Sequence, residues 1–529
     1  MRLLQKCCLA AVAMALFSTG CQAQVEQSTQ PNIVLFLVDD MGWQDTSLAF
    51  TDEPTPFNRH FKTPNMELMA AQGVRFTQAY SHAVCSPSRV SMMTGQNPTR
   101  HHVSNWTRLP GEDHSGKWGP NGAPTHWRTE GLQPSDVTLP KLLQQSGYYT
   151  MHVGKAHFGA LGTKGGEPRN LGFDVNVAGH SAGAPASYWG EKNFGNDMPV
   201  IDGYPQGVPG LTEYHQKAVH LTDVLTQRAK QEITKATKTG KPFFLNMAHY
   251  AVHTPIESHQ RFMHEYTGKT YAGTDIDIPD IEEKYASLVQ GMDASLGDLM
   301  THLKALGVAD NTLVIFTSDN GGLSGHTRQT TPRGTELNSH NWPLNSGKGS
   351  AFEGGTRVPY IVSWVNNAPK LAQQKRLAIT PNSVSRQQII IEDLFPTILA
   401  VANSNAKIPK QHILDGIDVT KHWQNPSSEQ TRAMVFHYPH VWGPFGPGYE
   451  PHSAMRLGDW KVIYYYNSRA WQLYNIKDDL SERYDLAPTH RSKLEAMAGD
   501  LNQRLKQMDV QWPVNRVTGK VEPIMLPHY

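Results

Sequence analysis

Acidic and amide side chains follow two apolar runs of the chain, at the points where those runs end. Asp39 and Asp40 come directly after IVLFLV, and Asp319 with Asn320 comes after TLVIFTS. Three carboxylates and one amide oxygen form a hard oxygen set that suits Ca²⁺ or Mg²⁺ better than zinc. Taken alone, each pair is as consistent with a helix N-cap or an ordinary turn. The metal interpretation therefore depends on the two pairs lying together.

Lysines, histidines and one arginine stand in other segments of the chain, most of them rich in glycine or proline. They are Arg89 in CSPSR, Lys155 and His157 in GKAHFG, His249 and His253 in HYAVHTP, and Lys348 in SGKGS. One such side chain is usually solvated or satisfied by a hydrogen bond, whereas several brought together form an anion-binding set. The planar donor group of arginine suits a tetrahedral oxyanion. We therefore expect an anion site near the carboxylates.

Cys85, in the segment SHAVCSPSRVSMMTG, is the only cysteine beyond residue 21, since the other three are Cys7, Cys8 and Cys21. These three leave with the N-terminal signal or anchor it, so the mature chain holds no partner for a structural disulfide. A lone thiol is a liability in an oxidising compartment. Cys85 is therefore expected either to be buried as a small apolar residue or to be used chemically.

The segment CSPSR (85–89), followed by MTG (93–95), resembles the signature of the type I sulfatases of the alkaline phosphatase superfamily, in which the cysteine is oxidised to formylglycine (3-oxoalanine). Further motifs occur in that family's order: the double aspartate, GKAH, HTP, DNG, GKG before FEGG, DLFPTIL and WQLYNIKDDLSERYDLA. Gln96 departs from the arginine of many members. Pro87 and Arg89, the main determinants for the modifying enzyme, are present, so maturation by a formylglycine-generating or sulfatase-maturing enzyme is expected.

The resemblance also implies roles for individual residues. Formylglycine at position 85 would be the nucleophile and a ligand of a calcium ion, with magnesium as the alternative. The other metal ligands would be Asp39, Asp40, Asp319 and Asn320. Arg89 and Lys155 would orient the sulfate, His157 would be the base, and His253 or Lys348 would protonate the leaving alcohol. A hydrated aldehyde suits this chemistry because one hydroxyl attacks sulfur and the second allows sulfate to be expelled.

The substrate is less strongly indicated. Loops 101–130 and 175–215 are rich in aromatic and histidine residues, which either contact sugars or merely pack the loops. The candidates are Trp106, Trp189, His180, His215 and, outside these loops, His340. Exported bacterial members usually act on carbohydrate, so we expect a sulfated polysaccharide or oligosaccharide of algal or glycosaminoglycan type. The alternatives are a phosphodiesterase or phosphonate monoester hydrolase of the same superfamily, and a carbohydrate-binding lipoprotein without catalysis.

The N-terminus reads as a bacterial export signal: Arg2 and Lys6 precede a short apolar run and then small residues. FSTGC resembles a lipoprotein processing site that would remove the leader and lipidate Cys21, although Ser18 stands where leucine is usual. Cleavage after Ala23 is the alternative. The expected location is the periplasm or outer membrane of a Gram-negative bacterium, with membrane contact only through a lipid anchor. The 48 basic and 47 acidic residues favour neither nucleic acid nor an anionic membrane as a partner.

The elements that must position these residues are predicted from periodicity. Continuous apolar runs such as 33–38 are typical of parallel strands covered by helices on both faces. The segment 281–307 carries one apolar stripe at helical spacing. We therefore predict an α/β fold with a large, mostly parallel central sheet between helices, over a catalytic domain 30–425. The chain 426–529, with short aromatic strands and one amphipathic helix, is predicted to be a smaller α+β subdomain with an antiparallel sheet.

Overall fold

The computed structural model describes residues 30–527, apart from residues 201, 272–274, 276, 325–327, 329–338, 370 and 444–446. The predicted leader 1–21, its Cys21 and the alternative cleavage point after Ala23 lie outside the described residues. Within the described ranges, no helix is both long and apolar enough to cross a membrane.

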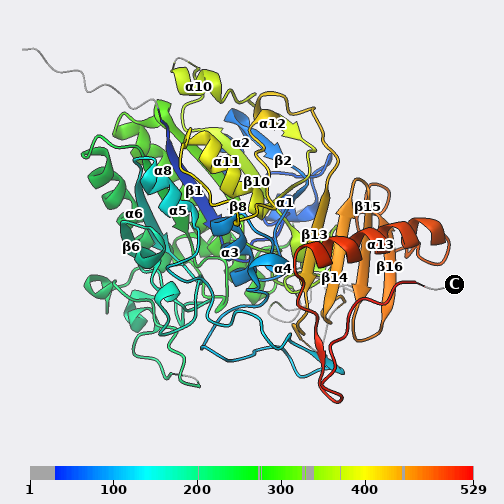
Figure 1. Cartoon of the computed structure of the whole chain (residues 1–529). Helices are drawn as coiled ribbons and strands as arrows, with labels where there is room; N and C mark the ends of the chain where they lie inside the picture. Colours follow the sequence, from blue (N-terminus) through cyan, green and yellow to red (C-terminus); the bar gives the residue numbers. More distant parts are fainter. Residues whose placement is uncertain are drawn as a thin grey trace, which may run out of the picture.

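A central sheet of eight strands, in the order β11-β2-β10-β8-β1-β7-β5-β6, organises the larger part of the molecule (Figure 1). Strands β8, β1, β7, β5 and β6 are parallel, whereas β10 runs antiparallel to β8 and β2. The bounds are β1 (Asn32–Val38), β2 (Val74–Phe76), β5 (Tyr149–Gly154), β6 (Val175–Val177), β7 (Phe243–Ala248), β8 (Thr312–Ser318), β10 (Tyr360–Trp364) and β11 (Ser383–Ser385).

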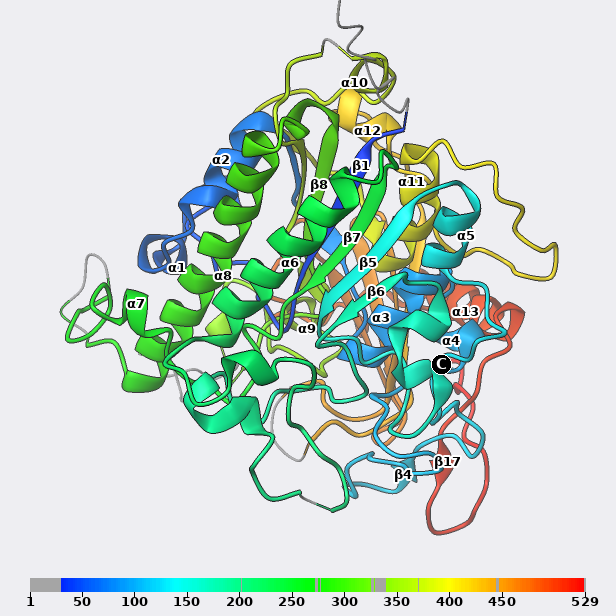
Figure 2. The same cartoon turned by 90° about the vertical axis from the view of Figure 1, so that its left-hand side faces the viewer.

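Helices cover both faces of this sheet, as Figure 2 shows most clearly for α2, α6 and α8. On that face lie α2 (Pro64–Gln72), α6 (Leu221–Thr237) and α8 (Asp280–Ala305); on the other lie α3 (Cys85–Thr94), α5 (Leu139–Gln145) and α11 (Leu394–Val401). A hydrophobic core lies on each face of the sheet. Successive side chains of β1 point alternately into these two cores, because side chains alternate between the faces along a strand. This confirms the predicted fold class, and it explains why β1 reads as one unbroken apolar run.

Shorter elements connect these layers. The helices are α1 (Pro56–His60), α4 (Pro98–His101), α7 (Gln260–Met263), α9 (Glu353–Thr356), α10 (Ala372–Arg376) and α12 (Lys421–Gln424). The strands are β3 (Ala79–Tyr80), β9 (Arg357–Val358) and β12 (Ile389–Ile390) in one small sheet, and β4 (Asn121–Gly122) paired with β17 (Val514–Asn515) in another.

The C-terminal part forms an antiparallel sheet of four strands in chain order, with one helix across it (Figure 1). The strands are β13 (Ala433–Tyr438), β14 (His452–Leu457), β15 (Trp460–Tyr465) and β16 (Ala470–Asn475), and the helix is α13 (Arg491–Gln507). Leu494, Met497, Leu501 and Leu505 of α13 join a hydrophobic cluster of this part alone. That separate cluster supports our proposal that residues 426–529 form a subdomain and residues 30–425 the catalytic domain.

A buried ionic cluster joins the C-terminal sheet to the larger part. Lys461 on β15 lies 3.1 Å from Glu353 of α9 and 2.8 Å from Glu482. Arg456 on β14 lies 3.5 Å from Glu353, to which the Tyr80 hydroxyl donates a hydrogen bond of 2.7 Å. Burial raises the pKa of Glu482 to about 7, although Lys461 lowers it. Because α9 follows the loop that carries the predicted Lys348, this cluster also anchors one side of the candidate site.

We expect Lys461→Met to lower the free energy of unfolding by about 3–5 kcal/mol, because two buried carboxyl groups lose their shared cation. Urea denaturation followed by circular dichroism measures this change. Lys506→Met, on an exposed position of α13, is the matched control and should stay within about 0.5 kcal/mol of the wild type. Equal stability of the two variants would show that the cluster contributes nothing to the fold.

Candidate active site

The predicted site residues follow four neighbouring parallel strands at their carboxyl ends. Asp39 and Asp40 follow β1, Asp319 follows β8, Lys155 follows β5, and His253 lies in the loop after β7. The sheet order β8-β1-β7-β5 makes these strand ends neighbours, and the register pairs the last residue of β1 with that of β8. The side chains therefore meet at one edge of the sheet, where open α/β sheets bind ligands.

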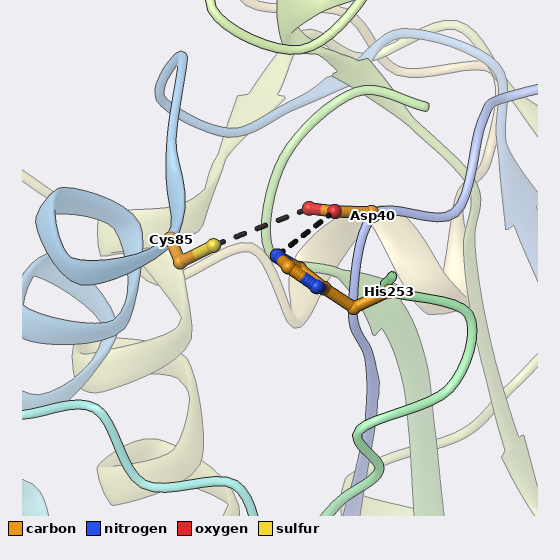
Figure 3. Close-up of side chains that lie close together, drawn as sticks. All are labelled: Asp40, Cys85 and His253. Atoms are coloured by element: carbon orange, nitrogen blue, oxygen red, sulfur yellow. Dashed lines mark hydrogen bonds and ion pairs between the residues drawn. The ribbon is translucent and has the colours of Figure 1, made fainter. Parts of the chain in front are cut away.

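Cys85 is the first residue of α3, and its thiol points toward this edge (Figure 3). Its side chain is 3% exposed, with Sγ 3.7 Å from Asp39 Oδ1 and 4.0 Å from Asp40 Oδ1. Lys348 Nζ donates to Sγ over 3.2 Å. The N-terminus of a helix is a favourable place for an anion, so the α3 backbone adds positive potential at Cys85.

Three buried cations balance the three carboxylates. Lys155 Nζ lies 2.6 Å from Asp39, and Arg89 Nε lies 2.7 Å from Asp319. Lys348 Nζ lies 2.6 Å from Asp40. None of these six side chains is more than 3% exposed. The ion pairs are thus shielded from water. Charge interactions in such a buried environment are much stronger than at a surface.

Burial and neighbouring charge act differently on the three carboxyl groups. The pKa of Asp39 is raised well above its usual range, because burial outweighs the attraction of Lys155. Burial also opposes ionisation of Asp40, but Lys348 and His253 hold its pKa below the ordinary value. For Asp319, burial is outweighed by Arg89 and Lys155, so its pKa is lowered as well.

The donor atoms around Cys85 fit a hard divalent cation. Two sets of ligand atoms each lie within 4.8 Å of one another, one from Asp39, Cys85 and Asp319 and one from Asp40, Cys85 and His253. Asn320 donates its amide nitrogen to Asp40 over 2.7 Å, while its Oδ1 is buried without a hydrogen-bond partner. An unpaired buried oxygen beside carboxylates is costly unless a cation or donor meets it. The arrangement therefore suits an oxygen-preferring ion such as Ca²⁺.

Two histidines of the site have defined hydrogen bonds. His157 Nε2 donates to the carbonyl of Thr107 over 2.9 Å, while its Nδ1 is buried without a hydrogen-bond partner. Burial, and then Lys155, lower the pKa of His157 well below its usual value, so the ring is neutral at pH 7. His253 Nδ1 donates to the carbonyl of Thr254 over 2.8 Å, and its Nε2 lies 3.4 Å from Asp40 (Figure 3). The His157 ring is thus arranged to accept a proton, whereas the His253 ring faces the carboxylates.

A pocket of about 190 Å³ opens above Cys85. Cys85, His157, His253 and Lys348 line its inner end, and its walls include Trp106, Gly183, Ala184, Tyr204, Gln206 and Trp442. Of the five residues predicted from the sequence to bind substrate, Trp106 is the one that lines this pocket. The geometry can therefore place an ester between the thiol position and the two histidines.

The other four predicted substrate residues lie elsewhere. His180 packs beside Tyr250, His215 contacts Phe194 edge-on, and Trp189 contacts His220 edge-on. His340 is fully buried, 3.8 Å from Glu282. These contacts fit the packing alternative that their composition left open, and a role of these four residues in substrate binding stays a prediction.

Tyr204, Gln206 and Trp442 were not predicted individually. Trp442 stands in HVWGPFGPGYE, between β13 and β14. Tyr204 and Gln206 stand in loop 175–215, which was predicted to face the substrate only as a whole. An aromatic residue within a glycine- and proline-rich loop was the available signal for Trp442. Its position beside Lys348 follows from packing between distant parts of the chain.

The fold and the site place the chain among the sulfatases. The model of the Sulfatase family matches residues 31–404, and the chain belongs to that family. Together with the CSPSR signature, this makes it a type I sulfatase and a sulfuric ester hydrolase.

Individual relatives are similar over most of the chain. A sulfatase of Formosa agariphila is 28% identical over 535 residues, which cover 92% of this chain and 90% of that protein. The N-acetylgalactosamine-6-sulfatase of Mus musculus is 31% identical over 396 residues, covering 74% of this chain and 65% of that protein. The crystal structure of Ps i-CgsB superposes with a TM-score of 0.68 at 26% identity, covering 91% of this chain and 94% of that one. That protein has also been solved with k-i-k-neocarrahexaose.

The first histidine of HYAVHTP, His249, contacts Ser295 of α8 rather than the carboxylates of the site, and it generates a pH prediction. It is fully buried, bonds Ser295 Oγ over 2.8 Å, and has its pKa lowered to about 3 by burial. In the unfolded chain the pKa of histidine is about 6.5, well above that of His249 in the fold. As the pH falls below about 6.5, the unfolded chain binds a proton that the folded chain does not, so the folded state loses stability.

We therefore expect the free energy of unfolding of His249→Gln to rise by about 2 kcal/mol relative to that of the wild type between pH 8 and pH 5. The difference grows at 1.36 kcal/mol per pH unit below about 6.5. Urea denaturation at the two pH values gives this difference. A difference between the two proteins that stays constant with pH would mean that His249 titrates normally in the fold.

Proposed function

We propose that this sulfatase removes sulfate esters from a carbohydrate, using formylglycine formed from Cys85 and a calcium ion. The observation that carries the proposal is the position of Cys85: a buried thiol among three carboxylates, at a helix N-terminus and at the base of a pocket. The N-acetylgalactosamine-6-sulfatase relative and the structure solved with k-i-k-neocarrahexaose support a sugar as the sulfate carrier. Algal polysaccharides and glycosaminoglycans are the two substrate types that we consider.

In this proposal Asp39, Asp40, Asp319 and Asn320, with residue 85, would hold the calcium ion. The ion would polarise the sulfate and lower the proton affinity of the attacking hydroxyl. A formylglycine hydrate at position 85 would supply that hydroxyl and a second one that permits turnover. The unpaired Oδ1 of Asn320 supports its assignment as a ligand.

The other predicted residues of the active site orient the ester and move protons. Arg89 and Lys155 neutralise charge at residue 85 and at the sulfate oxygens. The free Nδ1 of neutral His157 takes a proton from residue 85. His253 or Lys348, both lining the pocket, protonates the leaving alcohol.

Maturation must occur before folding if an enzyme modifies Cys85. Cys85 is 3% exposed and Arg89 is fully buried in α3, so a modifying enzyme that reads CSPSR reaches these residues only in the unfolded chain. We therefore propose that a formylglycine-generating or sulfatase-maturing enzyme acts on the new chain before it folds. The chain would then be exported to the periplasm or outer membrane, with Cys21 as the proposed lipid anchor.

The covalent proposal predicts a mass change at residue 85. In active protein from a host with the modifying machinery, the peptide around residue 85 should have lost one sulfur and two hydrogens and gained one oxygen. Cys85→Ala should abolish release of sulfate from an aryl sulfate, whereas an unmodified thiol in fully active protein would refute formylglycine. A paired aryl phosphodiester completes the test, because preference for it would assign the protein to phosphodiester hydrolysis.

The metal proposal predicts that calcium stabilises the folded protein. When calcium is added to chelator-stripped protein at one hundred times its dissociation constant, the free energy of unfolding should rise by about 2.7 kcal/mol. Asn320→Ala should weaken calcium binding at least about tenfold in calorimetric titration, since it removes a ligand oxygen. Asn425→Ala, at an exposed position, is the matched control. Unchanged calcium affinity in Asn320→Ala would exclude Asn320 from the site.

A further inference from the structure

The pocket above Cys85 has two tryptophan walls that come from distant parts of the chain. Trp106 belongs to the loop after α4, and Trp442 belongs to the connection between β13 and β14. Trp442 lies against the reaction centre, with Lys348 Nζ 5.6 Å from the centre of its ring. Gly349 permits this approach, because a Cβ at that position would fall 2.2 Å from the indole ring.

Both walls are held in place by histidines that take no part in the chemistry. The Trp106 ring stacks on His114, with 4.6 Å between ring centroids and 25° between ring planes. His440, two residues before Trp442, bonds Ser104 Oγ over 2.9 Å and Ser115 Oγ over 2.6 Å. The segment that carries Trp442 is thereby tied to the loop that carries Trp106. The two rings are therefore fixed walls, which lowers the entropic cost of binding a ligand between them.

The walls carry little charge. Among the described residues that line the pocket, the ionic groups at neutral pH belong to the reaction centre, and the other side chains are aromatic, amide or small. Arg108 lies 5.3 Å from the Tyr204 ring and 3.6 Å from Asp202, and it is not among the residues that line the pocket. A sugar carboxylate in the pocket would thus be desolvated without a cation of its own, which is unfavourable. A ring that bears only hydroxyl or amide groups meets no such cost.

The size of the pocket limits how much of a chain enters it. Its 190 Å³ is below the roughly 300–1,000 Å³ of pockets that enclose drug-sized ligands, and it corresponds to one sugar ring with its sulfate. An internal residue of a polysaccharide would bring a neighbour on each side, and both neighbours would have to leave through the mouth of the pocket. A terminal residue brings one neighbour, which can point out to solvent.

We propose that the pocket selects a sulfated, uncharged hexose or N-acetylhexosamine at the end of a chain, and that Trp106 and Trp442 hold its ring. This inference rests on the proposed function, whose site it deepens. The enzyme is accordingly exo-acting, and a sulfated uronic acid is a poor substrate. Trp442 is a specificity-determining residue supplied by the proposed C-terminal subdomain.

The test compares matched oligosaccharides that carry one sulfate on a terminal hexose, on an internal hexose or on a terminal uronic acid. Sulfate release is measured by ion chromatography. For the wild type we expect kcat/KM at least about tenfold higher for the terminal hexose than for either other substrate. Trp106→Ala and Trp442→Ala should each raise KM for the terminal hexose about tenfold, because they remove a stacking face.

Matched controls separate binding from folding. Trp442→Phe keeps an aromatic wall and should recover most of the lost affinity, whereas Trp460→Ala, on β15 and outside the pocket, should leave KM unchanged. Thermal unfolding shows whether each variant is folded. If the wild type hydrolyses an aryl sulfate but releases internal sulfate as fast as terminal sulfate, or favours the uronic acid, this inference is overturned. If it hydrolyses no sulfate ester at all, the proposed function fails instead.

Discussion

Burial of three carboxylates at the ends of β1 and β8 is the constraint on which the rest of the site depends. Each ion taken out of water costs several kcal/mol unless opposite charge and hydrogen bonds replace the solvent. Three segments therefore each supply a buried cation: Arg89 from α3, Lys155 from the chain after β5, and Lys348 from the loop before α9. Each of the three carboxyl groups thus has a cationic partner. In the proposed function, a divalent cation and a sulfate dianion would add equal and opposite charges to this set.

The same constraint accounts for how the C-terminal part is attached. The chain from Lys348 to Glu353 links the reaction centre to the buried cluster of Lys461, Arg456 and Glu482. Breaking a buried ion pair is far more costly than losing a surface one. The segment from Lys348 to Glu353 is therefore anchored at both ends by charge. A mobile loop would lose more entropy each time that Lys348 met its partners.

The amino-acid sequence was sufficient to predict the features that depend on local patterns. The apolar runs predicted buried strands, the stripe in 281–307 predicted α8, and the polar residues after each run lie at one edge of the sheet. Features that depend on long-range packing were not predictable. His249 and His253 stand in one short segment, yet one enters the core beside Ser295 and the other faces Asp40. Residue type cannot distinguish them, because both positions accept a neutral imidazole.

The roles of aromatic and histidine residues in the long loops were likewise not predictable from the sequence. Loop packing and sugar recognition use the same types of side chain. Trp106 and Trp442 differ from the others by lining the pocket, and Trp442 also contacts Lys348. A sugar ring that displaces water from the Trp442 face also lowers the local dielectric around the ammonium group of Lys348. Coulombic interactions strengthen as the dielectric falls, so Lys348 acts more strongly on its partners at residue 85 and Asp40. Recognition of the sugar and stabilisation of charge at the sulfate are thus joined through one side chain.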